Sequence, residues 1–511
     1  MIKEHLPATE GNSGRKRPSI ILSTAIIKII SDIRFWILIC FVVRLIGITQ
    51  PPLETAHNWR QTLGTMVIRN YYETDANIFH PRIDIGGDMA GITGMEFPLF
   101  NYIAYLISLL FGYQHWYGRL INLIVSSCGI LAYYSLIRDY MKDQKLAFYS
   151  SIILLFSLWF SYSRKIMPDT FSMSLIIMAL YFGYRYLTPV CSNRKNNWIN
   201  LMLFGITASA GMLTKLPSAY LMPVLAVPFF ECRKNIARMA AFGAASLICL
   251  SVTGLWYGYW VPHLAEKYHV SHFYMGTGLA SGFAELAPHI SLVMHRFYKT
   301  ALQYVGFVMS LFGLGVALVR RNLKVLTVLL LCFPAFLMVV LVSGCNFAYH
   351  TYYIIPYVPI MALLAGVGVK AVKPRSLLIF ILAAVCIEGI VARQNDFRIK
   401  SRNLALLHLE SDLDSCSSRN ALIAVNGSGS PTAVYFAHRK GWSLHNDEIL
   451  NKSFVENLRQ RGLQYIVIMN HIFGAAPITL ELPALIKKDA YTIYALSGQS
   501  PSAPGTKNKQ Q

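Results

Sequence analysis

The sequence is poor in charged residues. They make up 14% of its 511 positions, whereas soluble proteins have about 25%. Hydrophobic residues make up 54%, and apolar runs of about twenty residues, the length that crosses the hydrocarbon of a bilayer, recur along the chain. This composition excludes an ordinary soluble protein and predicts an α-helical polytopic membrane protein.

The sequence also lacks the patterns of several other protein classes. Its nine cysteines form no CxxC or Cys/His metal-ligand spacing, and the histidines of residues 259–299 are too irregularly spaced to favour a zinc site. The basic N-terminus lacks the apolar core and cleavage site of a signal peptide, so we expect the first helix to stay as an anchor. There is no internal repeat and no nucleotide-binding motif in the basic loops.

The net charge of +21 does not indicate a nucleic-acid partner. The basic residues cluster in short loops between apolar runs, as the positive-inside rule expects, and some meet anionic membrane lipid. A further apolar run, residues 97–111, is short, and crossing there would invert every later basic loop. We therefore predict that it is a juxtamembrane helix. The eleven predicted transmembrane helices are 35–49, 120–137, 146–162, 171–187, 198–214, 218–231, 239–258, 300–319, 325–343, 352–370 and 376–392.

This topology divides the chain into four parts. We predict a cytoplasmic N-terminus at residues 1–34 and a transmembrane module at 35–393, with an outside catalytic loop at 51–119. ALIAV, QYIVIMN and YTIYAL then predict strands, and TAVYFAH and EILNKSFVENLRQRG predict helices. They indicate a small periplasmic α/β domain at 394–498, followed by a disordered tail at 499–511.

The polar stretch from Pro51 to Gly112 is too long for a minimal hairpin, and long ordered loops in compact proteins are usually functional. Together with later outside segments it supplies the candidate site residues. They are Glu54, Arg60, Gln61, Asp84, Glu96, Arg164, Asp169, Lys215, His350 and Tyr353.

Several candidates have plainer explanations. Helix N-capping is an alternative for Asp169, beside Pro168, and a lysine that reaches from a helix end to water is an alternative for Lys215. An aromatic belt at the membrane surface explains Tyr353 but not His350.

Outward-facing carboxylates, a few cations and an apolar groove suit transfer from a lipid-linked phosphate donor. A carboxylate deprotonates the acceptor hydroxyl. Arginine, lysine or a divalent metal ion stabilises the leaving phosphate. The outer face of the membrane lacks nucleotide sugars, so the donor must be carried by a lipid.

An ordered set of motifs carries a family resemblance: HNWRQ, PRID, MEFPLFNY, FGYQHWYGR, SRKIMPDTF, LTKLPSA and HTYYIIPYVP. The set spans about residues 35–370. It resembles the GT-C membrane glycosyltransferases, in particular bacterial relatives of aminoarabinose-to-lipid A transferases and protein O-mannosyltransferases. The resemblance implies a GT-C fold and transfer of a hexose or pentose from polyprenyl phosphate to lipid A, polysaccharide or protein. The expected location is the periplasmic face of a bacterial inner membrane.

The resemblance also implies roles for individual residues. Glu96 matches the acid that holds a metal or the donor phosphate, and Arg164 with Asp169 matches the acidic second loop. Lys215, His350 and Tyr353 match positions that line the donor cavity. We expect Arg60 and Gln61, in HNWRQ, to join them at the donor phosphate.

The sequence departs from the family at two positions. HNWRQ has no acid in register with the family's presumed base, so Glu54 or Asp84 would take that role, with Asp169 as a further catalytic acid. Phe97 stands where the aminoarabinose enzymes have a lysine, so Arg82 or Lys215 would supply the cation.

Two other functions keep the same architecture. A transporter or flippase of lipid-linked sugars would place acids in mid-helix and repeat its halves. A non-catalytic subunit of an envelope polysaccharide assembly complex would leave the carboxylates dispersed.

Overall fold

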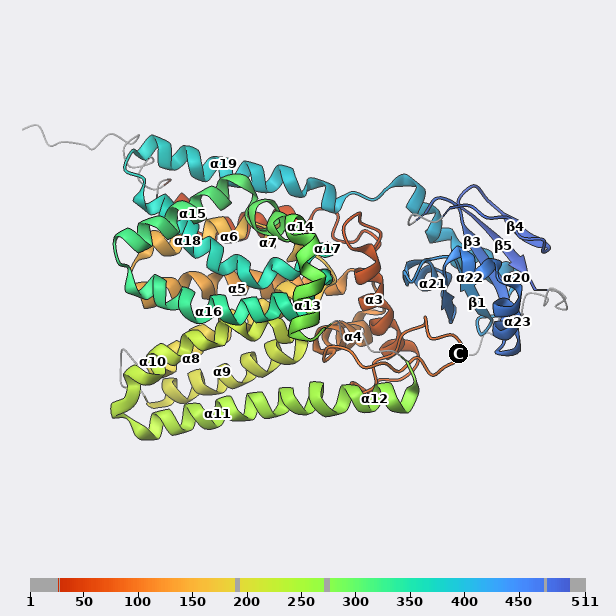
Figure 1. The fold of residues 1–511 in the computed structure, drawn as a ribbon, viewed down its shortest axis with the longest axis horizontal. Helices are drawn as coiled ribbons and strands as arrows, with labels where there is room; N and C mark the ends of the chain where they lie inside the picture. The colour runs from red at the N-terminus through yellow and green to blue at the C-terminus, as the bar shows by residue number, and fades with distance from the viewer. Residues whose placement is uncertain (1–25, 27, 189–193, 271–275, 473–475, 497–511) are drawn as a thin grey trace, which may run out of the picture.

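The computed structural model describes residues 26, 28–188, 194–270, 276–472 and 476–496. The predicted tail at 499–511 and most of the predicted N-terminal part at 1–34 lie outside these residues. A bundle of long helices and a small sheet form the two ends of the molecule, and the polar segment that follows the first long helix lies between them (Figure 1).

Helices form at all eleven predicted positions. The segment at 216–231 is the least regular, with 3-10 turns around Pro223, because proline lacks the amide hydrogen that a helix interior needs. In chain order the helices are α2 (Ile33–Leu45), α5 (Tyr117–Met141), α6 (Gln144–Leu155), α8 (Pro168–Leu187), α9 (Arg194–Thr214), η1 (Leu216–Leu225) with α10 (Ala226–Glu231), α11 (Ile236–Leu255), α15 (Gln303–Val319), α16 (Leu323–Ser343), α18 (Val358–Ala371) and α19 (Arg375–Arg393).

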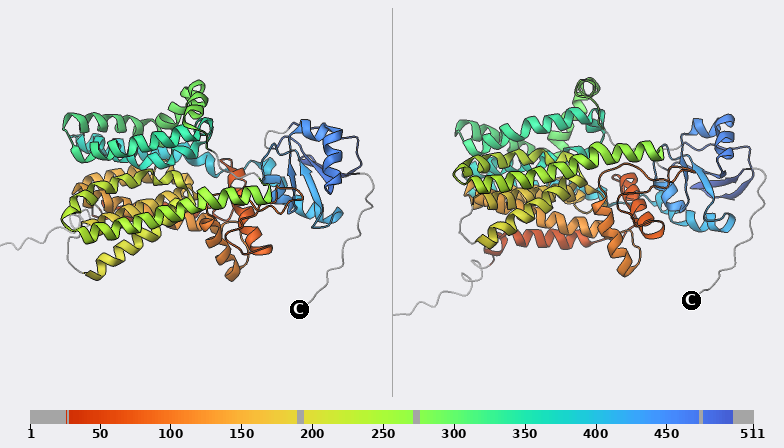
Figure 2. Two further views of the ribbon diagram at one scale, coloured as in Figure 1. Left: turned by 60° about the horizontal axis from the view of Figure 1, so that its bottom comes forward. Right: turned by 90° about the horizontal axis from the view of Figure 1, so that it is seen from below.

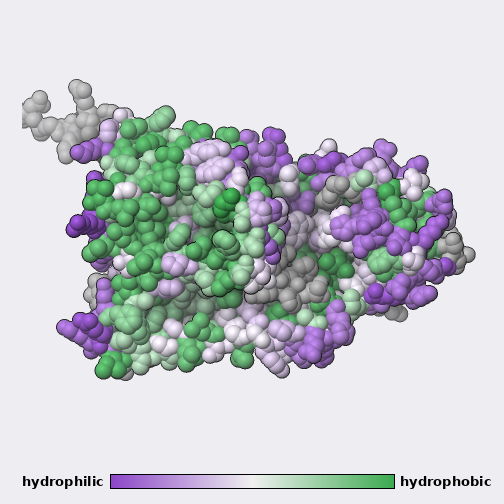
Figure 3. Space-filling view, in the orientation of Figure 1, coloured by the Kyte–Doolittle hydropathy of each residue, from purple (hydrophilic) through white to green (hydrophobic). Residues whose placement is uncertain are grey.

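Within the described residues, five helical stretches are long and apolar enough to cross a membrane: Tyr117–Met141, Ile236–Tyr268, Leu323–Ser343, Thr351–Ala371 and Arg375–Phe397. A sixth arises if the bent pair Leu279–Ala301 and Gln303–Val319 is one span. Apolar side chains cover the flank of the bundle, and hydrophilic ones gather at the end far from the sheet (Figure 3). The helical architecture is thus confirmed, whereas the count of eleven spans stays a prediction.

The basic turns of the bundle meet at one end, as the predicted topology requires. The end of α5 and the turn after it are the centre of this arrangement, because side chains from the ends of α8, α16 and α18 contact them. Lys370 pairs with Asp143, Lys324 Nζ donates to the Tyr140 carbonyl at 2.8 Å, and Arg185 lies 3.7 Å from Asp139.

The polar segment after α2 contains α3 (Asn58–Glu73) and α4 (Leu99–Phe111). Both lie outside the stack of long helices, between it and the sheet (Figure 2). Helix α4 buries Phe100 and Ala104 and exposes Leu110 and Phe111. A helix with one buried and one exposed apolar face suits the predicted juxtamembrane position.

The C-terminal part is a five-stranded mixed sheet with strand order β2-β1-β3-β5-β4. Its strands are β1 (Leu422–Val425), β2 (Gly441–Ser443), β3 (Leu463–Met469), β4 (Ala484–Lys487) and β5 (Tyr491–Ala495). β1 pairs in parallel with β2 and β3, and β5 is antiparallel to β3 and β4. Helix α20 (Leu409–Cys416) precedes the sheet, and the helices between its strands are α21 (Thr432–Ala437), α22 (Asn446–Leu450) and α23 (Lys452–Gln460). The α/β organisation agrees with the sequence, which did not indicate β2 or β4.

One hydrophobic core joins the polar segment to the sheet. Leu63 and Met66 of α3 belong to the same buried cluster as Val434 of α21 and Val467 of β3. The segment between the bundle and the sheet is therefore ordered by apolar packing on its sheet side, which fixes α3 and the side chains that it carries.

Candidate active site

Four charged side chains from four segments meet where α3, α8 and α9 come together. Lys215, directly after α9, places Nζ 2.8 Å from Asp169 Oδ1 and 3.8 Å from Glu96 Oε1. Arg60 of α3 pairs through Nη2 with the same oxygen of Glu96. We call Arg60, Glu96, Asp169 and Lys215 the charge cluster.

Local structure fixes the charge cluster from both sides. The amide of Phe97 donates to the Leu213 carbonyl at 3.0 Å, and the indole of Trp256 donates to the Met95 carbonyl at 3.0 Å. These bonds hold Glu96 against the end of α9. Lys215 then follows α9 in an extended conformation, with φ −161°, which turns its side chain back toward Glu96.

Both plainer explanations for residues of the cluster are wrong. Met167, not Asp169, is the N-cap of α8, and Asp169 lies in the first helical turn with its carboxylate on Lys215. Lys215 is only 8% exposed, and its ammonium turns to Asp169 rather than extending to bulk water. Asp169 is 3% exposed, which makes their contact a buried ion pair.

The electrostatics keep Glu96 ionised. Burial on its own would raise the pKa of this carboxyl, but the charges of Arg60 and then Lys215 outweigh burial and lower the pKa. Glu96 is therefore a carboxylate at neutral pH, and it holds both cations in place.

Aromatic rings cover the ammonium of Lys215. Its Nζ lies 5.1 Å from the ring centre of Tyr352 and 6.0 Å from that of Tyr353, within cation–π range. His350 stacks on Tyr352 with ring centres 5.3 Å apart. The predicted His350 and Tyr353 thus lie beside the charge cluster.

The His57 ring lies beside those of His350 and Tyr352. His57 is the N-cap of α3 in the left-handed conformation, with φ 56°, and its Nε2 lies 2.9 Å from Thr351 Oγ1. Burial, followed by the charge of Lys165, lowers the pKa of His57 to about 3. The imidazole is therefore neutral at physiological pH.

A cleft of about 270 Å³ opens beside the charge cluster. Its polar end is formed by Arg60, Glu96, Lys215 and the two tyrosines, and its wall is apolar. The wall includes Leu216, Val261, Met338, Val339 and Val342. No sequence pattern singled out the last three as site residues, because apolar residues are expected throughout a membrane-spanning helix such as α16.

Glu54 lies outside this cleft, in a second buried cluster. Its carboxylate is 3.0 Å from Arg164 Nη2 and 3.5 Å from both Arg119 Nη2 and Lys165 Nζ. Burial would raise its pKa, but these three cations lower it. A carboxylate that is 0% exposed and held by three cations has no access to an acceptor, so its contacts favour a structural role.

Gln61 and Arg164 belong to this second cluster as well. Gln61 Nε2 donates to Glu54 at 3.4 Å, and the amide of Ile166 donates to Gln61 Oε1 at 3.3 Å. Arg164 also donates to the carbonyls of Ile46 and Gly47, at 2.6 and 2.9 Å. The hydrogen bonds of both residues connect loops to one another. Neither residue is among the described residues that line the cleft.

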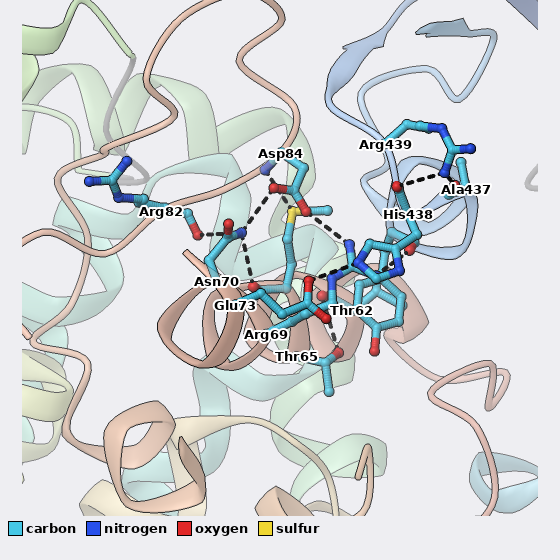
Figure 4. A network of polar contacts seen from close by, with 12 residues as sticks. Thr62, Thr65, Arg69, Asn70, Glu73, Arg82, Asp84, Ala437, His438 and Arg439 are labelled. Atoms are coloured by element: carbon cyan, nitrogen blue, oxygen red, sulfur yellow. Dashed lines mark hydrogen bonds and ion pairs between the residues drawn. The ribbon is translucent and has the colours of Figure 1, made fainter. Parts of the chain in front are cut away.

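Asp84 lies in a third network, at the border with the C-terminal sheet (Figure 4). Its carboxylate accepts hydrogen bonds of 2.9 Å from Arg69 and from Asn70 of α3. Arg69 also donates to the Tyr435 carbonyl at 2.9 Å. The contacts of Asp84 therefore join the loop, α3 and the C-terminal part.

The donor set of the charge cluster does not fit a divalent metal ion. Glu96 and Asp169 already have Lys215 and Arg60 as counter-charges, whereas Mg²⁺ and Ca²⁺ require several oxygen ligands. No group of three or more His, Cys, Asp or Glu side chains is placed to hold a metal within the residues that the structure describes. The expectation that Glu96 is a metal ligand thus has no support from its surroundings.

Comparisons with solved structures identify the architecture. ArnT from Cupriavidus metallidurans in the apo state has a TM-score of 0.56 and 14% identity, covering 90% of this chain and 97% of that chain. The same protein bound to undecaprenyl phosphate has a TM-score of 0.57 and 13% identity, covering 90% and 98%. The chain has the GT-C fold of membrane glycosyltransferases. The apo oligosaccharyltransferase of Archaeoglobus fulgidus is a more distant GT-C structure, with a TM-score of 0.52, 12% identity and coverage of 85% and 69%.

Sequence comparison agrees over part of the GT-C module. Residues 96–257 match the family model described as dolichyl-phosphate-mannose-protein mannosyltransferase. The match begins at Glu96 and includes Asp169 and Lys215, three of the four residues of the charge cluster. No curated protein matches the chain.

Proposed function

We propose that this GT-C protein is a glycosyltransferase. It takes a sugar from a polyprenyl-phosphate donor and passes it to a hydroxyl of lipid A, polysaccharide or protein in the cell envelope. The observation that carries this proposal is the cleft, whose apolar wall ends at the charge cluster. Such a site suits a molecule with a long hydrocarbon tail and a phosphate head.

The donors of the charge cluster suit a leaving phosphate. Lys215 can make three hydrogen bonds, and Arg60 Nε has no hydrogen-bond partner among the described residues. Both groups have donor capacity left while they contact Glu96. As the anomeric carbon–oxygen bond breaks, negative charge grows on the phosphate, and fixed cations in a buried site stabilise it more than water does.

Of the three predicted catalytic carboxylates, only Asp169 contacts a described residue that lines the cleft: it does not line the cleft itself, but its Oδ1 lies 2.8 Å from Nζ of Lys215, which does. Oδ2 of Asp169 has no hydrogen-bond partner in the described part of the chain, whereas Glu54 and Asp84 are held by arginines elsewhere. In the proposed step the acceptor oxygen forms a bond with the anomeric carbon, its proton passes to Asp169, and the polyprenyl phosphate leaves.

The distribution of basic residues indicates which side of the membrane the site faces. The basic turns meet at one end of the bundle, and the positive-inside rule assigns that end to the cytoplasm. The C-terminal sheet lies at the other end, and α3, which carries Arg60 of the charge cluster, lies between it and the bundle (Figure 1). We therefore place the charge cluster and the sheet on the periplasmic side of a bacterial inner membrane.

Mass spectrometry of envelope glycans from a deletion strain tests the proposal. The wild-type gene should restore a hexose or pentose that the deletion removes, and Glu96→Gln and Asp169→Asn should not. Full restoration by both variants would contradict the site. Purified protein should also transfer sugar from polyprenyl phosphate in detergent, which neither a flippase nor a non-catalytic subunit would do.

A further inference from the structure

A second cavity lies at the end of the bundle that carries the basic turns. It is lined by residues that precede and begin α2, by α6, and by α19 with the turn before it, and its volume is about 1110 Å³. Helix α19 lies at the edge of the bundle, with most of its apolar side chains exposed. We call this cavity the basic groove.

The walls of the basic groove are apolar along most of its length. Trp36 of α2 and Phe148 of α6 face Leu378, Leu382 and Ile387 of α19 across it. The lining of α19 runs from Arg375 to Ile387, which is about 18 Å at about 1.5 Å per residue. One leaflet of bilayer hydrocarbon is about 15 Å thick, so the groove has the length of one lipid chain.

Cations surround only one end of the basic groove. They are Lys145, Lys370, Lys373 and Arg375. Lys370 pairs with Asp143, but no carboxylate in the described chain forms an ion pair with the other three. An apolar channel with uncompensated cations at one end complements an amphiphile with a negatively charged head.

We propose that the basic groove binds an acidic phospholipid. Its headgroup phosphate contacts Lys145, Lys373 and Arg375, and one acyl chain lies between α2, α6 and α19. Basic pockets between membrane helices hold acidic headgroups in this way. A second copy of this chain would bring the same three cations to the interface and be repelled, which favours lipid over self-association.

The fluorescence of Trp36 can report lipid binding, because this side chain lines the groove. The full chain is placed in phosphatidylcholine vesicles that contain either brominated phosphatidylglycerol or the same fraction of brominated phosphatidylcholine. Bromine quenches tryptophan on contact, and subtracting Trp36→Phe isolates the signal of this residue. We expect an apparent affinity for phosphatidylglycerol at least roughly fivefold higher, the preference contributed by a single lysine or arginine at an acidic surface.

A matched pair of triple variants separates the groove from general surface charge. Lys145→Gln/Lys373→Gln/Arg375→Gln should abolish the preference. Arg233→Gln/Arg320→Gln/Arg321→Gln removes three exposed cations that do not line the groove and should retain it. Equal quenching by both lipids, a preference that survives the first variant, or equal loss in both variants would overturn the proposal. A melting curve for each variant shows that the folded protein is being compared.

Neither triple variant touches the charge cluster or its cleft. Sugar transfer and lipid preference are therefore independent measurements, and failure of one proposal leaves the other standing.

Discussion

Lys215 is the residue that connects the two carboxylates of the charge cluster. Lys215→Met should lower sugar transfer by about 10²–10³, the usual cost of removing one donor that stabilises charge in a transition state. The measurement is the transfer rate in detergent at saturating donor, compared with wild type.

A double variant distinguishes two reasons for that loss. Lys215→Met leaves Asp169 buried without its counter-charge, which can itself disturb the site. Lys215→Met/Asp169→Met removes both charges, but also the proposed base, so the informative measurement is binding of undecaprenyl phosphate. If Lys215 holds the phosphate, binding is weak in the single and the double variant. Recovery of binding in the double variant would assign Lys215 to charge compensation alone.

For Glu54 the main predicted effect of substitution is a loss of stability. Glu54→Gln removes the carboxylate that compensates Arg119, Arg164 and Lys165, and breaking a buried ion pair costs about 3–5 kcal/mol. We expect a marked fall in melting temperature together with lost transfer. Glu96→Gln is the comparison: the Glu96 side chain is 18% exposed at the cleft, whereas that of Glu54 is 0% exposed, so water can solvate the cations that Glu96 leaves and we expect a smaller loss of stability. A Glu54→Gln protein with wild-type stability and no transfer would make Glu54 a catalytic residue after all.

The sequence identified the residues of the charge cluster but not their partners. Glu96, Asp169 and Lys215 each stood out as polar groups beside apolar helices. Nothing in the spacing of Asp169 and Lys215 along the chain indicates an ion pair, since the contact depends on how α8 and α9 pack. For the same reason Glu54 resembled a catalytic acid, because its three cations come from segments more than sixty residues away.

At the scale of elements, the close approach of the loop at 82–94 to strand β2 depends on Gly87. Its φ is +64°, and a Cβ there would lie 2.1 Å from Cε2 of Trp442. The Gly87 amide also donates to the Gly441 carbonyl at 2.8 Å. A side chain at this position must therefore displace the Trp442 ring or the loop that packs on it.

Gly87→Ala should release this contact, and Gly112→Ala is its matched control. Both glycines have positive φ, but a Cβ on Gly112 meets nothing within 4 Å. Both variants cost about 1–3 kcal/mol for a positive-φ backbone that residues other than glycine rarely adopt, and Gly87→Ala adds about 1–3 kcal/mol for overpacking. Faster hydrogen exchange of residues 82–94 is expected in Gly87→Ala only. Equal exchange in the two variants would mean that the Trp442 contact does not hold the loop.

The sequence predicted most of the elements, and its failures have simple causes. The long apolar runs and the buried strands β1, β3 and β5 have strong periodic or continuous hydrophobic patterns. β2 has only three residues, and β4 is largely exposed, so neither produces such a pattern. Pairing with neighbouring strands, rather than local sequence, defines both of them.

At the scale of the whole molecule, His438 connects the C-terminal part to α3. Its Nδ1 lies 2.9 Å from Glu410 Oε1, and its Nε2 lies 2.8 Å from Glu73 Oε2 of α3. Glu410 and then Glu73 raise the pKa of His438, against burial and the charge of Arg69. Arg419 Nη1 lies 2.9 Å from Nδ1 and is the other cation that faces the ring.

The raised pKa makes the contact between the two parts pH-dependent. A group whose pKa is higher when folded contributes stability below its unfolded pKa, about 6.5 for histidine, and loses it as pH rises through the folded value. The imidazolium bridges two carboxylates, whereas a neutral ring donates to only one. We therefore expect the C-terminal part to be held more firmly to α3 at pH 6 than at pH 8.

Hydrogen exchange of α3 and α21, measured across this pH range and corrected for the intrinsic rate, tests the expectation. Protection should fall as pH rises in the wild type, and this dependence should disappear in His438→Gln. His408→Gln, which removes an exposed histidine of the same region, should keep it. Helix α3 also carries Arg60, so loss of the His438 bridge would make the position of Arg60 in the charge cluster less firmly held. A pH dependence that persists unchanged in His438→Gln would place the responsible titrating group elsewhere.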